Sequence, residues 1–327
     1  MSKPKLVVTR ELPEEAMHLL KEEADLYVWE SESESIPRSV LLQEVQQATG
    51  IVTNVADSID REVLDAAPHL RVVSTMAVGF DNIDVNTATQ RGIAIGHTPG
   101  ILTETTADLT FALLMATARR VVDGDRFVRN GEWKSWGPML LTGQDIYGAT
   151  IGIIGMGRIG EAVARRAAGF AMKLLYHNRS RRPEVEQKLG AEYRSLDELL
   201  AESDYVVLMA PGSPDTYRMI GAREISLMKR SAVFINTSRG TNVDEQALYQ
   251  ALKEKRIWAA GLDVFEQEPI RTDHPLLSLD NVVVLPHIGS ASIATRTRMA
   301  VIAAKNALAG IRGERLLHTV NPEVYEA

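Results

Sequence analysis

Three polar side chains whose chemistry could act together on a carbonyl group each follow an apolar run of the sequence. They are Arg239, Glu268 and His287. An arginine can bind a carboxylate or carbonyl oxygen through paired hydrogen bonds, and a histidine can donate a proton near neutral pH. A carboxylate beside the histidine would favour the imidazolium form and orient the ring. This combination suits the reduction of a carbonyl group in a substrate that also carries a carboxylate.

A glycine motif that could hold a dinucleotide lies between the apolar run Ala149–Ile154 and an Ala- and Arg-rich stretch with helical character. Its residues are Gly155, Met156, Gly157, Arg158, Ile159 and Gly160. The first glycine would make the tight turn from strand to helix, the second would let the backbone approach a pyrophosphate, and the third would let the helix pack closely. The pyrophosphate would lie on the free N–H groups of the helix N-terminus.

The next apolar run, Met172–His177, ends in an unusual set of residues for such a site. An acidic residue ordinarily binds the ribose 2′-hydroxyl there, whereas this chain has Asn178, Arg179, Ser180, Arg181 and Arg182. Guanidinium groups bind phosphate oxygens through charge-assisted hydrogen bonds. The sequence therefore predicts that NADPH is preferred as cofactor and that NADH can also be used.

These residues would be positioned by strands that alternate with helices, a pattern typical of parallel sheets covered by helices. In the first hundred residues we expect strands over Lys5–Val8, Gly50–Val55, Leu70–Met76 and Ile93–Ile95, and helices over Pro13–Glu23, over Ser58–Ala67 and from near Asp84. A long helix is expected over Thr103–Arg120. Later strands are expected over Asp204–Met209, Ala232–Asn236, Trp258–Leu262 and Asn281–Leu285, with a helix after Val243. Because ligands bind at the carboxyl ends of such strands, the three polar residues would meet there.

The domain boundaries follow from a turn and from the last helix. A turn at His97–Gly100 predicts a hinge, and a helix over Ile293–Gly310 would cross back to the first domain. We expect one domain of residues 1–98 and 290–327 and a second of residues 99–289. Residues Val121–Gly148 show little periodicity and are predicted to form an extended arm. Its tryptophans, Trp133 and Trp136, would either anchor a subunit interface or pack on their own subunit.

Composition limits the classes of function. The 327 residues are 45% hydrophobic, which is enough for a large core, and they include no cysteine, which excludes disulfides, thiolate metal sites and a cysteine nucleophile. No signal-peptide core or membrane-length apolar segment is found, so a cytoplasmic location is expected. The net charge of −7 opposes binding to nucleic acid or to an anionic membrane. We expect a small-molecule partner and no metal site.

Taken together, the motifs resemble the D-isomer-specific 2-hydroxyacid dehydrogenases, and within them the glyoxylate/hydroxypyruvate reductases. The resemblance covers nearly the whole chain. It is carried by the glycine motif above and by Ala77–Asp84, Thr98-Pro99, Gly131–Trp133, Ser238–Gly240, Gly261–Pro269 and Leu285–Ala291. It implies an α/β fold of two doubly wound parallel-sheet domains, a Rossmann NAD(P)-binding domain and a flavodoxin-like substrate domain. It also implies a homodimer whose arm contributes to the interface, and domains that close before hydride transfer.

The same resemblance implies a role for each matching residue. Arg239, Glu268 and His287 would be catalytic, with Arg239 on the substrate's carboxylate and carbonyl. The backbone at Val78 and Gly79 would also hold the carboxylate, as amides in a glycine-containing turn can. Besides the glycine motif and Asn178–Arg181, the cofactor would contact Thr105, Pro211, Thr216, Thr237, Ser238, Asp263 and Gly289, of which Asp263 would hold the nicotinamide carboxamide.

The resulting hypothesis is NADPH-dependent reduction of a small 2-keto acid, glyoxylate or hydroxypyruvate, to glycolate or D-glycerate. Two alternatives are also enzymes: a reductase of a longer 2-keto acid of the 2-ketogluconate type, and D-3-phosphoglycerate dehydrogenase. A third, of another class, is a non-catalytic regulator that senses dinucleotides through this fold. The complete set of Arg239, Glu268 and His287 favours turnover over sensing.

Overall fold

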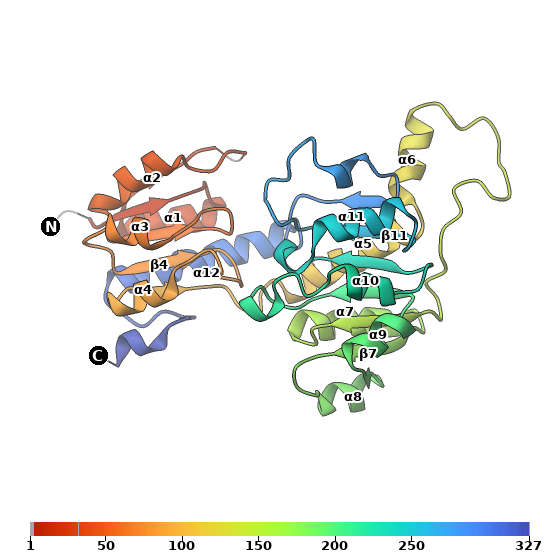
Figure 1. The fold of residues 1–327 in the computed structure, drawn as a ribbon. Coiled ribbons are helices and arrows are strands. Elements are labelled where there is room, and N and C mark those ends of the chain that lie inside the picture. The colour runs from red at the N-terminus through yellow and green to blue at the C-terminus, as the bar shows by residue number, and fades with distance from the viewer. Residues whose placement is uncertain (1–2, 32, 327) are drawn as a thin grey trace. The chain divides into compact units, whose positions relative to one another are not determined.

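The chain folds into two compact units, each built on a parallel sheet (Figure 1). The structure, a computed structural model, describes residues 3–31 and 33–326. The first unit comprises Met1–Leu102 and Ala291–Ala327, and the second comprises Thr103–Ser290. The sequence predicted residues 1–98 and 290–327 for one domain and 99–289 for the other, so the first unit runs four residues further, to Leu102, and resumes one residue later, at Ala291. The backbone N–H of Thr98 donates to Ala77 O at 2.8 Å, within the first unit.

The described part of the first unit contains a five-stranded sheet in the order β2-β1-β3-β4-β5, all parallel. This is the flavodoxin-like order. The strands are β1 (Lys5–Val8), β2 (Asp25–Val28), β3 (Gly50–Thr53), β4 (Val72–Thr75) and β5 (Ala94–Gly96). The helices are α1 (Glu14–Glu23), α2 (Arg38–Glu44), α3 (Arg61–Asp65), α4 (Val85–Gln90) and α12 (Ile293–Ile311), with 3₁₀ turns at Val45–Gln47 and Pro322–Tyr325.

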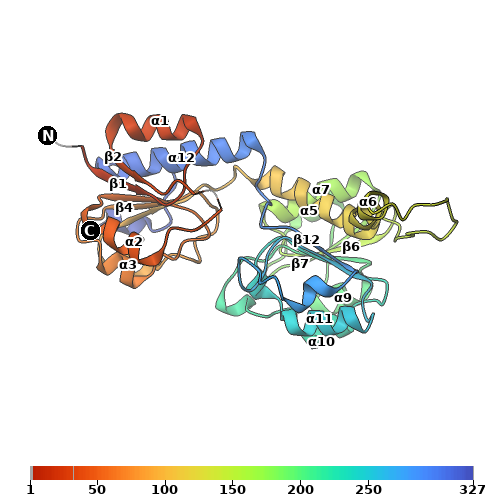
Figure 2. The same ribbon diagram turned by 90° about the horizontal axis from the view of Figure 1, so that it is seen from above.

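Alternate strand residues of the first unit point to opposite faces of its sheet, as the strand period requires. Leu6 and Val8 belong to the core under α1 and α12, whereas Val7 belongs to the core that includes residues of α2, α3 and α4. Figure 2 shows α1 and α12 on one face and α2 and α3 on the other. Helix α12 thus completes a core whose strands come from the beginning of the chain.

The second unit has a seven-stranded parallel sheet among its described residues, in the order β12-β11-β10-β9-β6-β7-β8. The strands are β6 (Thr150–Ile154), β7 (Lys173–His177), β8 (Glu192–Tyr193), β9 (Tyr205–Leu208), β10 (Val233–Asn236), β11 (Ala259–Leu262) and β12 (Val282–Val284). The order reverses beside β6, which makes its carboxyl end the switch point where this Rossmann arrangement binds ligands. The fold class predicted from the sequence is confirmed for both units.

Two layers of helices cover the second sheet. The helices are α5 (Thr103–Ala118), α6 (Val121–Arg129), α7 (Arg158–Gly169), α8 (Pro183–Leu189), α9 (Leu196–Glu202), α10 (Ala222–Leu227) and α11 (Glu245–Lys253), with 3₁₀ turns at Pro214–Thr216, Gly240–Asn242 and Pro275–Ser278. Figure 2 shows α5 and α7 on one face and α9, α10 and α11 on the other. Ile153 of β6 packs in the first layer and Ile154 in the second. None of the helices in the described residues is long and apolar enough to cross a membrane.

The arm predicted for Val121–Gly148 is only partly extended. Residues Val121–Arg129 form α6, and the chain then runs without helix or strand from Asn130 to Ala149 (Figure 1). Helix α6 has no buried residue and is held by the local pairs Arg120–Asp123 and Arg129–Asp125. The apolar side chains of α6 nevertheless gather on one face of the helix, so the helical period was present in the sequence and the sequence analysis missed it.

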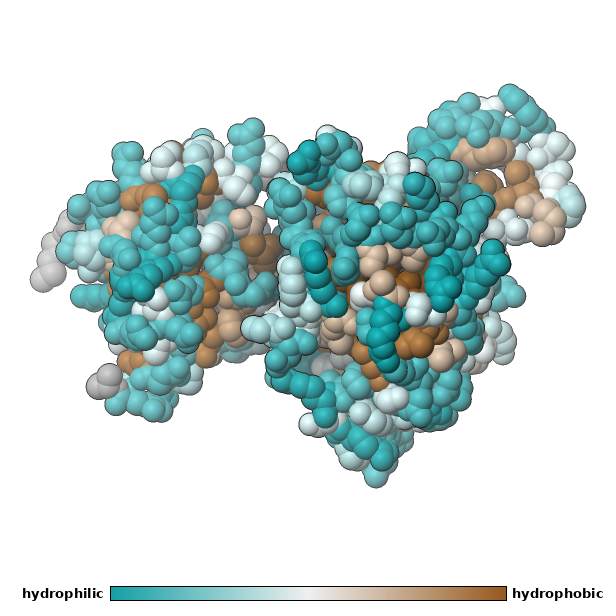
Figure 3. All heavy atoms as spheres, viewed as in Figure 1, coloured by the Kyte–Doolittle hydropathy of each residue, from teal (hydrophilic) through white to brown (hydrophobic). Residues whose placement is uncertain are grey.

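Residues 130–148, the arm, form the extended part of this segment. The arm carries large exposed hydrophobic side chains, and Figure 3 shows brown, hydrophobic atoms on the surface of this projecting segment. These are Trp133, Trp136, Met139, Leu140 and Tyr147. Trp133 is 60% exposed and Trp136 is 79% exposed. The alternative that the tryptophans pack on their own subunit is therefore wrong.

Candidate active site

The residues predicted to be catalytic lie just beyond the carboxyl ends of three neighbouring strands of the second unit. Arg239 follows β10, Glu268 lies in the loop after β11, and His287 follows β12. These strands are adjacent in the order β12-β11-β10. All three side chains are thus at the edge of the sheet where parallel α/β folds bind ligands.

The imidazole of His287 and the carboxylate of Glu268 form a close pair. His287 Nδ1 lies 2.6 Å from Glu268 Oε2, and both side chains are about one-third exposed (30% and 34%). The other oxygen, Glu268 Oε1, accepts the backbone N–H of Phe265 at 3.0 Å, which fixes the carboxylate. With Nδ1–H donating to Glu268, Nε2 is the ring nitrogen available to a ligand.

The backbone of His287 holds the ring in this place. Its φ of +54° is in the left-handed region, which is uncommon for residues other than glycine and is seen where the surroundings enforce it. The N–H of His287 donates to Asp263 O at 2.9 Å, and the N–H of Ile288 donates to Asp263 Oδ1 at 2.8 Å. Asp263, at the end of β11, therefore fixes the turn that presents His287.

Asp263 also offers a buried acceptor. The residue is 1% exposed, burial raises the pKa of its carboxyl, and its Oδ2 has no hydrogen-bond partner in the part of the chain that the structure describes. A Cβ added to Gly289 would lie 3.3 Å from this oxygen. Buried polar atoms are almost always hydrogen-bonded. A ligand that supplies an N–H donor, such as a carboxamide, would satisfy Asp263 Oδ2.

Arg239 is placed by the short 3₁₀ turn that follows β10. The side chain of Asn236 closes this turn, because its Nδ2 donates to Arg239 O at 3.0 Å and its Oδ1 accepts the N–H of Ser238. Arg239 Nη1 donates to Ser238 O at 2.9 Å. A Cβ on Gly240 would lie 1.8 Å from Phe265 C, so the turn packs directly against the loop that carries Glu268.

The three motif glycines between β6 and α7 have different surroundings. Gly155 has a φ of +102°, and a Cβ there would be 2.7 Å from Met209 C. A Cβ on Gly160 would be 2.2 Å from Gly155 O, whereas one on Gly157 would meet nothing within 4 Å. The tight turn thus requires glycine at position 155, and the close packing requires glycine at position 160. At Gly157 the space beside the backbone is open. The first N–H groups of α7, at Arg158 and Ile159, have no partner within the helix and can bind an anion.

The arginines after β7 differ in what they bind. Arg181 makes two hydrogen bonds to Glu186, and Arg182 pairs with Glu184 and donates to Met156 O at 2.8 Å. Arg179 is exposed and has neither an ion pair nor a side-chain hydrogen bond with any residue that the structure describes. Asn178 Nδ2 donates to Ser180 O at 3.0 Å and closes the loop.

The other predicted residues lie in both units. In the second unit, Thr105 is in the first turn of α5, Thr216 Oγ1 donates to Pro211 O at 2.7 Å, and Thr237 Oγ1 lies 2.7 Å from Thr110 Oγ1. In the first unit, Val78 and Gly79 follow β4, and His97 Nδ1 lies 3.1 Å from Val78 O.

Three residues that support the site were missed by sequence reasoning. Asn236, Thr110 and His97 form hydrogen bonds or close polar contacts with predicted site residues or with their backbone. A buried polar residue within an apolar run was the only signal for the first two.

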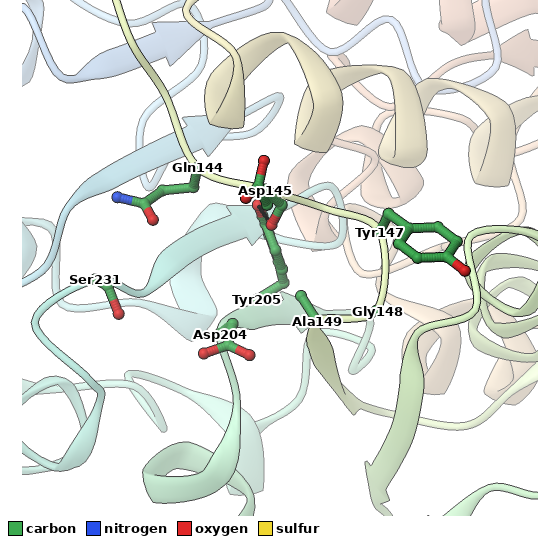
Figure 4. A pocket seen from close by; sticks show the side chains of 8 residues that line it. All are labelled: Gln144, Asp145, Tyr147, Gly148, Ala149, Asp204, Tyr205 and Ser231. Carbon is green, nitrogen blue, oxygen red and sulfur yellow. Dashed lines mark hydrogen bonds between the residues drawn. The ribbon is translucent and has the colours of Figure 1, made fainter. Parts of the chain in front are cut away.

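A pocket of about 290 Å³ lies at the opposite edge of the second sheet (Figure 4). Its lining residues lie before β6, at the start of β9 and before β10, and they are Gln144, Asp145, Tyr147, Gly148, Ala149, Asp204, Tyr205 and Ser231. Tyr205 Oη donates to Asp145 O at 2.8 Å, and Asp204 binds Lys229. None of the predicted site residues lines it. In the described residues there is also no group of three or more His, Cys, Asp or Glu side chains that could hold a metal ion.

Comparison with known proteins identifies relatives along the whole chain. The family model for the D-isomer specific 2-hydroxyacid dehydrogenase, NAD binding domain, matches residues 111–289. A glyoxylate reductase of Korarchaeum cryptofilum is 54% identical over 323 residues, which are 98% of this chain and 97% of that protein. The crystal structure of a protein from Thermus thermophilus has a TM-score of 0.91 at 45% identity, covering 97% of this chain and 99% of the other. An NADPH-dependent glyoxylate/hydroxypyruvate reductase of Sinorhizobium meliloti, in complex with NADP and malonate, has a TM-score of 0.85 at 33% identity, covering 98% of both chains.

Proposed function

The chain belongs to the D-isomer specific 2-hydroxyacid dehydrogenase family, and from that premise we propose that it reduces glyoxylate, and also hydroxypyruvate, with NADPH. It is an oxidoreductase that uses a nicotinamide dinucleotide and acts on CH–OH groups. The observation that carries the proposal is the 2.6 Å pair of His287 and Glu268 at the same sheet edge as Arg239. Two relatives named glyoxylate reductases, which are 54% and 52% identical over 98% of this chain, support glyoxylate as the substrate.

The second unit has the features that a dinucleotide needs. The pyrophosphate would lie on the N-terminus of α7 beside Gly157, and the nicotinamide carboxamide would donate to Asp263 Oδ2. Thr105, Pro211, Thr216, Thr237, Ser238 and Gly289 are proposed to line the same cofactor. The chemistry supplied by a bound reduced nicotinamide is a hydride for the carbonyl carbon of the substrate.

The protein's own residues would bind the keto acid and move the proton. Arg239 would hold the carboxylate and polarise the carbonyl through its fork of N–H donors. His287 would donate a proton from Nε2 to the carbonyl oxygen as that oxygen becomes a hydroxyl, and then recover a proton from solvent. Glu268 would accept the Nδ1–H of His287 and keep the ring oriented. In the first unit, the amides of Val78 and Gly79 keep their proposed role as carboxylate donors.

The preference for NADPH rests on the loop after β7. This loop has no acidic residue from Asn178 to Arg182, and its Arg179 is exposed and unpaired among the described residues. A guanidinium group there favours a 2′-phosphate over a 2′-hydroxyl. The Sinorhizobium meliloti relative, named as NADPH-dependent and crystallised with NADP, supports this choice.

We also propose that the chain forms a homodimer through the arm. Trp133 and Trp136 are mostly exposed, and tryptophans are enriched at the centres of protein interfaces. A monomer would leave these large side chains, together with Met139 and Leu140, in water.

An assay of NADPH oxidation with a panel of 2-keto acids tests the proposed reaction. The panel is glyoxylate, hydroxypyruvate, 2-ketogluconate and 3-phosphohydroxypyruvate, and turnover should be fastest with the first two. His287→Ala should lower kcat by roughly 100-fold or more, because the carbonyl oxygen loses its proton donor. His18→Ala, which removes an exposed histidine paired with Glu22, serves as the control and should retain activity. Binding of NADPH without turnover of any of the four acids would favour a dinucleotide sensor instead.

A further inference from the structure

The loop that follows β7 contains an internal ion pair which neutralises one of its arginines. Arg181 Nε lies 3.0 Å and Nη2 lies 2.6 Å from the two carboxylate oxygens of Glu186. This bidentate arrangement uses the donors that the same guanidinium would otherwise offer to a phosphate. Glu186 lies in the first turns of α8, directly after the loop.

Glu186 is anchored from a second side by a buried tyrosine. Tyr176, at the end of β7, is 0% exposed, and its hydroxyl donates to Glu186 Oε1 at 2.6 Å. The same hydroxyl accepts the backbone N–H of Arg182 at 2.7 Å. The Arg181 guanidinium and the Tyr176 hydroxyl hold the pKa of the Glu186 carboxyl below its ordinary value. The carboxylate is therefore a fixed negative charge at the rim of the ribose end of the dinucleotide site.

The two other arginines of the loop do not repeat this arrangement. Arg182 Nη1 reaches back to Met156 O in the glycine turn, so it ties the loop to the pyrophosphate end of the site. Arg179 has no ion-pair partner among the residues that the structure describes, and its side chain is exposed. A 2′-phosphate would thus meet two guanidinium groups of different kinds. That of Arg179 has no carboxylate beside it among the described residues, whereas that of Arg181 is already paired with the Glu186 carboxylate.

We infer that Glu186 is a specificity-determining residue that limits the preference for NADPH over NADH by neutralising Arg181. The inference rests on the proposed position of the 2′-phosphate beside Asn178–Arg182. A phosphate dianion is repelled by Glu186 and attracted by Arg181, and the two effects nearly cancel while the pair is intact. NADH has no charge at this position, so neither residue affects its binding through charge.

Substitution of the carboxylate by its neutral isostere tests the inference. Glu186→Gln keeps an acceptor for the Tyr176 hydroxyl but removes the charge, so the dissociation constant of NADPH should fall by roughly fivefold. The dissociation constant of NADH should change by less than about twofold, since no phosphate is present. Both constants can be measured by titrating the protein's fluorescence with each cofactor. Glu314→Gln, which removes an exposed carboxylate paired with Arg312 in the first unit, is the control and should leave both constants unchanged.

A double-mutant cycle distinguishes neutralisation from direct contact. Arg181→Gln alone should weaken NADPH binding by roughly fivefold because Glu186 is then unpaired, and Arg181→Gln combined with Glu186→Gln should return it to the parent value. If the double variant binds NADPH as weakly as Arg181→Gln, Arg181 itself contacts the phosphate and the inference is wrong. If Glu186→Gln weakens the binding of both cofactors, Glu186 only supports the loop and the inference is also wrong.

Failure of the underlying cofactor assignment has a different signature. Arg179→Gln should weaken NADPH binding by roughly tenfold or more without affecting NADH, because it removes a charge-assisted hydrogen bond to the phosphate. Equal effects of Arg179→Gln on both cofactors would show that the phosphate does not lie at this loop. A selective effect of Arg179→Gln together with an unchanged NADPH constant in Glu186→Gln would reject the role of Glu186 alone.

Discussion

The smallest functional part of the molecule is the pair formed by the His287 ring and the Glu268 carboxylate. Glu268 is fixed by the Phe265 N–H, and His287 is fixed by a left-handed backbone tied to Asp263. Proton donation from His287 requires the imidazolium form at the moment of reaction. The carboxylate oxygen at 2.6 Å from Nδ1 accepts the N–H of that nitrogen and leaves Nε2 as the donor toward a ligand.

Glu268 should therefore act through the orientation of His287. In Glu268→Gln the shape of the side chain is kept, but a neutral amide oxygen accepts the Nδ1–H more weakly than a carboxylate oxygen, so the ring is held less firmly. We expect kcat for keto-acid reduction to fall by roughly tenfold or more. The measurement is kcat at saturating NADPH, with the NADPH dissociation constant as a control that should not change. An unchanged kcat in Glu268→Gln would show that Glu268 does not act through His287.

Asp263 is expected to serve the cofactor at a cost to stability. Burial raises the pKa of its carboxyl above the ordinary value of roughly 4. The stabilising contribution of the neutral form is complete below that value, and it is lost as the pH rises through the higher pKa of the folded state. Asp263→Asn has no charge to bury, so its melting temperature should improve relative to the parent as the pH rises from roughly 4 to 8.

The same substitution should weaken cofactor binding. The carboxamide would lose a charged acceptor, which corresponds to roughly a tenfold higher dissociation constant for NADPH or NADH. Thermal unfolding of the apo protein at several pH values, together with cofactor titration, measures both effects. A stability difference between the two proteins that does not vary with pH would contradict the ionised, buried carboxylate.

At this scale the sequence could predict which residue types meet, but not how they are paired. Strand ends and the glycine motif place Arg239, Glu268 and His287 at one sheet edge, because the carboxyl ends of parallel strands share an edge. The state of the loop arginines could not be predicted. Whether Arg181 is free depends on Glu186, and that pairing exists only because α8 starts directly after the loop.

At the scale of elements, helix α12 shows how closely a helix and a sheet approach in the first unit. A Cβ added to Gly310 would lie 2.4 Å from Val72 Cβ on β4. A Cβ added to Gly169, at the end of α7, would meet nothing within 4 Å. Both glycines lie in helices, but a methyl group would have open space at Gly169 and no room at Gly310.

Alanine substitution of these two glycines should therefore have opposite effects on stability. Gly169→Ala should be neutral or stabilise by up to about 1 kcal/mol through helix propensity. Gly310→Ala gains the same helix propensity, but its new Cβ must displace the Val72 side chain at Cβ, where that side chain branches. We therefore expect the free energy of unfolding to fall by about 1–2 kcal/mol. Urea unfolding of both variants measures the difference. Equal stability of the two variants would mean that α12 can move away from β4 without cost.

Elements with buried faces were predicted better than those without. The strand over Lys5–Val8 and the helix after Val243, with Leu248 and Leu252 buried on one face, occur as the sequence indicated. The sequence analysis missed β2, whose residues are mostly only partly buried, and α2, which buries only Leu41. In β2 and α2 few residues are selected by a core, so the hydrophobic period carries little information. The sequence analysis also read α6 as extended, although the apolar side chains of α6 gather on one face of the helix.

At the scale of the whole molecule, the arm predicts an assembly. Replacing both exposed tryptophans, as Trp133→Ser with Trp136→Ser, should raise the dimer dissociation constant by roughly 30-fold or more, as expected for loss of central interface residues. Sedimentation velocity over a concentration series measures this. Leu317→Ser removes another exposed apolar side chain, 57% exposed in the first unit, and should leave the dimer unchanged. A parent protein that sediments as a monomer would overturn the proposal.

The interrupted path of the chain through the first unit has a consequence for synthesis on the ribosome. Strands β1 to β5 leave the ribosome early, but α12, which covers one face of their sheet, follows only after the whole second unit. At about 5–20 residues per second, the apolar face formed by Leu6, Val8 and Val72 waits for about 10–40 seconds before its cover is made. The second unit, being continuous, can fold during that interval. Nascent chains stalled with Ser290 just outside the exit tunnel and α12 still inside it should thus resist protease in the second unit and be cleaved in the first, which would make the early strands a binding segment for a chaperone.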